Sequence, residues 1–145
     1  MLSLNMVRFT LTKTERLSSL KAIDKLFEGG QSLAKFPVRL VWLEIKEPDS
    51  MPFPVQVMFS ASKKKFNKAV DRNRIKRLMR EGYRLIKPDL YKDLPAGKFF
   101  HLALIYSGME ILDQATIQKS INEALKRWLK TLTPDPSITE TGSKA

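Results

Sequence analysis

The chain has 145 residues, no cysteine and a formal net charge of +11 at neutral pH. The length suits one domain with a hydrophobic core, and the lack of cysteine excludes disulfides, thiolate nucleophiles and cysteine-based zinc sites. No apolar run approaches the ~20 residues of a membrane-spanning helix, and the N-terminus has no sustained apolar stretch of the kind found in secretion signals, so we expect a cytoplasmic protein.

The first predicted element is a helix near the N-terminus. Residues 1–12 are expected to form a loose or weakly extended lead-in. Apolar residues then recur at helical spacing from Leu17 to Phe27. Because Gly29-Gly30 provides a clear stop, the sequence predicts an amphipathic helix over about residues 16–28.

Two short segments with the composition of β-strands follow this helix. Residues 38–45 and 55–62 are rich in β-branched and apolar residues, and the linker between them contains three prolines. Alternation assigns one face of the first strand to Val38, Leu40 and Trp42 and the other to Arg39, Val41 and Leu43. We expect the two strands to pair antiparallel, although a linker of this length permits other pairings.

A basic loop and a second helix come next. Residues 63–68 are expected to form the loop, and the helix is predicted to begin near residues 69–71. Pro88 should end or interrupt it, because proline lacks the N–H of a helical hydrogen bond. Residues 88–97 are therefore predicted to be irregular.

The last elements are a strand and a helix. Residues 99–106 are nearly all apolar, which is typical of a strand buried on both faces. Asp113 is expected to cap a final amphipathic helix, and the polar residues 133–145 are expected to be a disordered tail. The order helix, strand, strand, helix, strand, helix indicates an α+β or α/β sandwich. Of these we expect α+β, a single domain over residues 1–132 with one small mixed sheet and helices packed on it.

The positive charge is concentrated in residues 62–87. This segment holds eleven lysines and arginines against two acidic residues, a net charge of +9, whereas fifteen basic and thirteen acidic residues lie elsewhere. A field focused in this way indicates a polyanionic partner, above all a nucleic acid.

The spacing of these charges argues against an ordinary solvated helix, which is the usual explanation of a charged one. Arg72, Lys76 and Arg80 stand four residues apart, where like charges repel by a few tenths of a kcal/mol per pair. Glu81 is the only acid on that exposed side. The final helix differs, because Glu123 lies four residues from each of two basic residues. An external anion would offset the repulsion in the basic helix.

We therefore predict an RNA-binding surface on the loop and the exposed side of the helix. Arginine can bind two phosphate oxygens at once, and asparagine suits a sugar hydroxyl or a base edge. The predicted RNA-binding residues are Lys63, Lys64, Lys65, Lys68, Arg72, Asn73, Arg74, Lys76, Arg77 and Arg80. Phe66 lies among them, and a core anchor and a base-stacking platform are equally consistent with its position.

The segment SASKKKFNKAVDRNRIKRLMRE resembles the signature of the protein subunit of bacterial ribonuclease P. In that signature, Ser-Lys-Lys leads into Ala-Val-x-Arg-Asn-Arg-x-Lys-Arg. The matching residues are Ser62, Lys63, Lys64, Ala69, Val70, Arg72, Asn73, Arg74, Lys76 and Arg77, and Arg80 continues the match. FTLTKTERLSSLKAIDKLFEGG also resembles the N-terminal segment of the family, so that the resemblance covers roughly residues 8–130.

The resemblance implies a small basic partner of a large catalytic RNA, and the two together remove the 5′ leader from precursor tRNA. It implies that the Arg-Asn-Arg helix binds the catalytic RNA, and that a cleft between helices and sheet holds the single-stranded leader. The implied fold is ribosomal-protein-like with a left-handed βαβ crossover, contrary to the usual handedness. The expected partners are the catalytic RNA and precursor tRNA, with no membrane and no obligate protein partner. The protein would bind no cofactor tightly, and divalent metal, Mg, would belong to the holoenzyme.

The candidate cleft residues depart from the family pattern. Ile23 stands where the family often has an aromatic, Phe27 is the aromatic that remains, and Val41 aligns with a further aromatic position. Trp42 is next to it and would face the cleft if the register slipped by one residue. Ordinary core packing explains Ile23, Phe27 and Val41 about as well. The loop KKKFNK is about one residue longer than the common form, with Phe66-Asn67 where a glycine is usual.

The sequence lacks the groups that a protein-only nuclease requires. Its single histidine, His101, lies inside an apolar strand, the acidic residues are scattered, and there is no glycine-rich phosphate loop. We therefore expect no catalytic residue in the protein itself. One alternative is a general or ribosome-associated RNA-binding protein without a processing role. A membrane-surface protein is a weaker alternative, because the basic helix shows no large apolar face with Trp or Phe.

Overall fold

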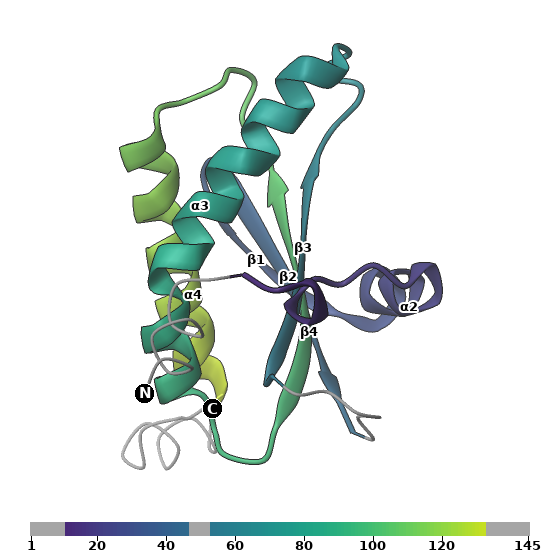
Figure 1. The fold of residues 1–145 in the computed structure, drawn as a ribbon, viewed down its shortest axis with the longest axis vertical. Coiled ribbons are helices and arrows are strands. Elements are labelled where there is room, and N and C mark those ends of the chain that lie inside the picture. Colours follow the sequence, from purple (N-terminus) through teal and green to yellow (C-terminus); the bar gives the residue numbers. More distant parts are fainter. Residues whose placement is uncertain (1–10, 47–52, 133–145) are drawn as a thin grey trace, which may run out of the picture.

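The computed structural model describes residues 11–46 and 53–132. The elements along the chain are η1 (Lys13–Glu15), α2 (Leu20–Gly29), β1 (Gln31–Lys35), β2 (Val38–Ile45), β3 (Val55–Ala61), α3 (Ala69–Asp93), β4 (Phe99–Tyr106) and α4 (Gln114–Leu132). The four strands form one mixed sheet in the order β1-β2-β4-β3. In Figure 1, α3 and α4 cover one side of this sheet and α2 lies on the other. The predicted α+β sandwich is confirmed, while the predicted tail, residues 133–145, lies outside the described residues.

The expected antiparallel pairing of residues 38–45 with 55–62 is wrong. β4 lies between them, pairing antiparallel with β2 and parallel with β3. The nearly continuous apolar sequence of β4 is best buried at the centre of the sheet, where helices cover both of its faces. β3, α3 and β4 thus form the parallel crossover whose left-handedness the resemblance implies.

One strand was not predicted, and one helix begins later than expected. β1 pairs antiparallel with β2 at the edge of the sheet and is short, polar and largely exposed, so it carries no apolar alternation. α2 begins at Leu20 rather than residue 16, because the Ser19 side chain caps it by accepting a hydrogen bond from the Ala22 N–H at 3.2 Å. Its predicted end at the glycine pair is confirmed.

The expectation that Pro88 ends or interrupts the second helix is wrong. α3 continues through Pro88 to Asp93, so that residues 88–93 are not irregular. Proline removes the hydrogen bond to the Arg84 carbonyl, at a cost of about 3 kcal/mol in a helix interior. Burial of Leu90 and Leu94 beyond the proline offsets this local cost.

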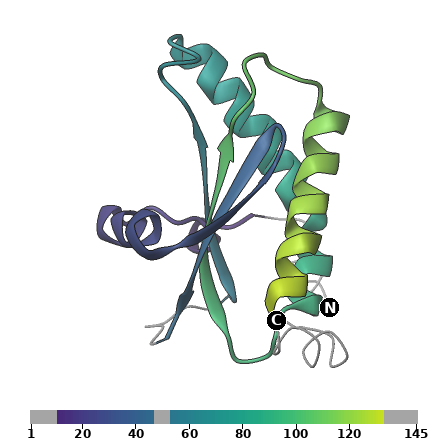
Figure 2. The same cartoon turned by 180° about the vertical axis from the view of Figure 1, so that it is seen from behind.

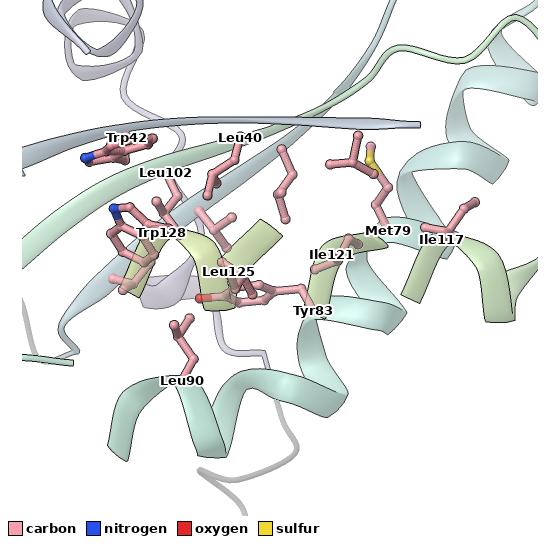
Figure 3. Packing of buried hydrophobic residues seen from close by; sticks show 14 of the residues in the cluster. Leu40, Trp42, Met79, Tyr83, Leu90, Leu102, Ile117, Ile121, Leu125 and Trp128 are labelled. Carbon is pink, nitrogen blue, oxygen red and sulfur yellow. The ribbon is translucent and has the colours of Figure 1, made fainter. Parts of the chain in front are cut away.

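The main core lies between one face of the sheet and the two long helices. Figure 3 shows side chains from the sheet, α3 and α4 meeting there, among them Leu40, Trp42, Met79, Tyr83, Leu90, Leu102, Ile117, Ile121, Leu125 and Trp128. A smaller cluster under α2 contains Leu17, Leu26, Val41 and Ala103. The predicted division of the β2 side chains between two faces is confirmed. Among the described residues, no helix has both the length and the apolarity of a membrane span.

Candidate nucleic-acid interface

The loop between β3 and α3 is fixed by local hydrogen bonds and one buried aromatic ring. Ser62 Oγ accepts from the N–H groups of Lys64 and Lys65 at 3.2 and 3.3 Å. The Phe66 ring is 7% exposed and packs against Tyr106, with 6.0 Å between the ring centroids. The structure therefore supports the core-anchor alternative for Phe66 over base stacking. With Phe66 anchored, the three preceding lysines are held on the surface.

The ten predicted RNA-binding residues lie on two consecutive segments, the loop after β3 and the first half of α3, and we call this set the basic ridge. It comprises Lys63, Lys64, Lys65, Lys68, Arg72, Asn73, Arg74, Lys76, Arg77 and Arg80, all exposed or half-exposed. The described residues form four ion pairs, and none of them involves the ridge. The nine cations of the ridge thus remain without a carboxylate partner among the described residues.

Two ridge arginines are held in place by contacts with neutral groups. Arg72 Nη1 donates to the Phe66 carbonyl at 2.8 Å, which ties the start of α3 to the loop. The Arg80 guanidinium carbon lies 5.7 Å from the centroid of the Phe59 ring. Burial lowers the pKa of Arg80, and the nearby charges of Arg16 and Arg77 lower it further. Its buried Nε has no hydrogen-bond partner in the described part of the chain. An external anion at the exposed part of the guanidinium would offset the repulsion from Arg16 and Arg77.

The basic segment of the sequence is not uniformly available for binding. Lys87 is fully buried, with its Nζ 2.9 Å from Glu15 Oε2. Tyr91 also donates to Glu15 at 2.6 Å, and the Thr12 N–H donates to it at 2.8 Å. Arg84 pairs with Glu81 on its own helix. The second half of α3 therefore anchors the N-terminal segment, while its first half carries the ridge.

This anchor brings an additional cation to the ridge. Arg16 follows Glu15 and forms a parallel β-bridge with Val57 at the edge of the sheet. A groove of about 290 Å³ lies between this segment, β3 and α3. It is lined by Arg16, Leu17, Ser18, Val57, Met58, Phe59, Lys76 and Arg80. Sequence reasoning did not single out Arg16, although it belongs to the Glu-Arg-Leu stretch that resembles the family.

The five candidate cleft residues separate into two groups. Val41 is buried beneath α2, where Ile23 packs beside it, and Phe27 on the same helix is 47% exposed. Trp42 faces the main core instead, 6.1 Å from Trp128 between ring centroids. The register therefore does not slip, and neither Trp42 nor Phe66 offers a stacking surface. Only Ile23, Phe27 and Val41 remain on the α2 side of the sheet.

In the described part of the chain, no metal-binding cluster accompanies these residues. His101 is half-buried in β4, and this burial lowers its pKa. Over residues 11–46 and 53–132, acidic and histidine side chains do not gather in groups of three or more that could hold a metal ion. The site is therefore a cationic surface beside a groove with an apolar floor, which suits the backbone and bases of RNA.

Comparison with known proteins agrees with this description. Residues 11–129 match the family model described as Ribonuclease P. The chain is 33% identical over 120 residues to the "Ribonuclease P protein component" of Porphyromonas gingivalis, with 82% of this chain and 86% of that protein covered. It is 43% identical over 91 residues to the protein of the same name from Chlorobaculum tepidum, with 59% of each covered.

Solved structures resemble the fold. The RNase P protein of Staphylococcus aureus superposes with a TM-score of 0.63 at 23% identity, covering 79% of this chain and 94% of that one. The RNase P protein of Thermotoga maritima gives a TM-score of 0.60 at 24% identity, covering 78% and 96%.

Proposed function

Because the chain belongs to the ribonuclease P protein family, we propose that it is the protein subunit of a ribonuclease P holoenzyme and that its basic ridge binds the catalytic RNA. The observation that carries this proposal is the absence of any carboxylate partner for nine ridge cations among the described residues. Like charges at helical spacing repel, and RNA phosphates supply the missing counter-charge. Binding should release counterions and therefore weaken steeply as salt is raised.

The groove beside the ridge is the candidate site for the 5′ leader of precursor tRNA. Arg16, Lys76 and Arg80 can neutralise backbone phosphates, while Met58 and Phe59, on opposite faces of the edge strand β3, give the bases apolar contacts. Leu17 and Met58 line the groove and also pack against the cluster under α2. Ile23 packs against the same cluster, and we propose that a single strand runs from the ridge past it towards Phe27.

Catalysis itself is assigned to the RNA subunit. The described residues offer no set of ligands for a metal ion, so the residues present do not fit a protein-held divalent metal. We assign the Mg of the holoenzyme to the RNA and derive no chemical step from the protein. In this proposal the protein binds and orients RNA and neutralises its charge.

The test is cleavage of precursor tRNA by the RNA of a bacterial ribonuclease P at low magnesium, with and without this protein. Stimulation of 5′ leader removal is the expected result, and no stimulation would favour a general RNA-binding protein instead. Replacing Arg72, Arg74 and Arg77 by Glu should abolish stimulation and lower the salt dependence of RNA affinity. Unchanged affinity and salt dependence in that variant would show that the ridge is not the binding surface.

A further inference from the structure

A second feature that suits RNA lies at the turn between β1 and β2, away from the groove. The Phe36 ring is 67% exposed. Single exposed apolar side chains are common, but this one projects from a fixed backbone. Ser120 Oγ of α4 donates to the Phe36 carbonyl at 2.8 Å, and the Ser107 N–H donates to the Pro37 carbonyl at 2.7 Å. The backbone that carries the ring is therefore already ordered before binding, so that binding need not order it.

Cations from two elements surround this turn. Figure 2 shows α4 running beside the β1–β2 hairpin. Lys35 Nζ of β1 lies 3.1 Å from Glu123 Oε1 of α4. This contact lowers the pKa of Glu123, as do the nearby charges of Lys119 and Lys126. Arg127 Nη1 donates to the Ala34 carbonyl at 3.4 Å. The sequence suggested that Glu123 balances the charge of α4, whereas in the fold it pairs with a lysine from β1. Asp89 of α3 lines the neighbouring grooves together with Lys119 and Lys126.

The turn is also connected to the basic ridge. Lys65 Nζ donates to the Ser107 carbonyl at 3.0 Å, and the N–H of the same serine holds Pro37. One residue of the loop after β4 therefore links the lysines of the ridge to the turn that carries Phe36. Lys65 and the backbone of the turn therefore contact the same residue, Ser107.

We propose that the β1–α4 edge, defined as Lys35, Phe36, Lys119, Lys126 and Arg127, is a second contact for the RNA that docks on the basic ridge. Phe36 stacks on an unpaired base, and the lysines and Arg127 contact the phosphates that flank it. Stacking tolerates any base, because every base has a π face. This inference rests on the proposed function, since it takes the ridge-bound RNA to be the catalytic RNA.

The test measures the affinity of the full chain for the catalytic RNA of a bacterial ribonuclease P, without precursor tRNA, at several salt concentrations. Phe36→Ala should raise Kd by about 5- to 150-fold with an unchanged salt slope, because stacking but no phosphate contact is lost. Phe36→Trp should retain the parental Kd, and its added fluorescence should be quenched by RNA. Leu20→Ala is the matched control, since Leu20 is 78% exposed on α2, and it should leave Kd unchanged.

A Phe36→Ala Kd within twofold of the parent would overturn the proposal. If the triple Glu variant of the ridge still lost binding, the proposed function would stand and only the second contact would be wrong. A photoreactive phenylalanine at position 36 gives an independent measurement. Crosslinking to a nucleotide of the catalytic RNA is expected, whereas crosslinking to a second copy of the chain would assign this edge to self-association and refute the RNA contact.

Discussion

The buried ion pair between Glu15 and Lys87 offers the sharpest test of how the N-terminal segment is held. Both side chains are 0% exposed, and Lys87 Nζ lies 2.9 Å from Glu15 Oε2. Replacing Lys87 by Met keeps most of the side-chain volume but leaves the Glu15 carboxylate buried without its cation. Removing one partner of a buried pair typically costs about 3–5 kcal/mol of unfolding free energy.

Two comparisons place this magnitude in context. Lys46 pairs with Glu44 at 3.7 Å while 82% of its side chain is exposed, so Lys46→Met should cost at most about 1 kcal/mol. The double variant Glu15→Gln with Lys87→Met removes both charges together. It should recover most of the lost stability, because a buried pair replaced by neutral groups of similar volume is often tolerated. The glutamine oxygen can still accept from the Thr12 N–H, while the Tyr91 hydroxyl, which bonds the other carboxylate oxygen, must rotate to accept from the amide NH2.

Urea unfolding of the parent and these variants measures the differences directly. The double-mutant cycle should give a coupling energy of several kcal/mol between positions 15 and 87. The reasoning fails if Lys87→Met costs no more than Lys46→Met, or if the double variant is less stable than either single one. Because Glu15 also fixes Arg16 beside the groove, Lys87→Met should impair precursor-tRNA cleavage more than affinity for the catalytic RNA.

Three further predictions concern the ridge, the core and pH. Arg74→Ala should lower the slope of log affinity against log salt by about 0.7–0.9, the value for one lost phosphate contact. Lys46→Ala, beyond the end of β2 that is far from the ridge loop, should not. Equal slopes in titrations of the two variants would remove Arg74 from the interface. Trp128 is fully buried, with 5.1 Å between the centroids of its ring and the Phe100 ring. Trp128→Ala should therefore lower the free energy of unfolding, measured in urea, by about 3–5 kcal/mol. A decrease below about 1 kcal/mol would contradict this packing. Burial lowers the pKa of His101 below its usual 6.5, so the unfolded chain takes up this proton at a higher pH than the folded chain. The free energy of unfolding should therefore fall as pH drops below about 6.5. His101→Gln should remove that part of the pH dependence, and an identical pH profile in parent and variant would refute the assignment.

Most individual elements could be predicted from local sequence, whereas their pairing could not. β2 and β4 carry apolar patterns strong enough to fix their bounds, and the basic helix was located near its true start at Ala69. The insertion of β4 between β2 and β3 depends on contacts between distant segments, which local patterns do not encode. β1 was not predicted, because an exposed edge strand lacks the apolar face that identifies a strand in the sequence. The prediction at Pro88 was wrong because burial of the side chains beyond it outweighs the tendency of proline to end a helix.

The residue types of the sequence were enough to predict the basic ridge. The parts of the candidate site that depend on how distant segments pack together were missed. Charge density and the Arg-Asn-Arg motif identified the basic ridge. The role of Arg16 could not be inferred, because its place beside Arg80 depends on a β-bridge to Val57. Stacking by Trp42 was considered because its neighbour Val41 is not aromatic. Alternation along β2 had already assigned Trp42 to the opposite face, and the structure shows that alternation prevails.

The two halves of α3 explain how one helix can carry so much unpaired charge. At 1.5 Å per residue its 25 residues span about 37 Å. The stripe Ile75, Met79 and Tyr83 is fully buried against the sheet and α4, which forces the opposite side, with its arginines, into solvent. Farther along, Glu15 and Glu81 pair with Lys87 and Arg84, so repulsion is confined to the first half. Packing of the second half thus holds the first half helical before RNA arrives, and RNA binding need not supply the free energy of ordering it.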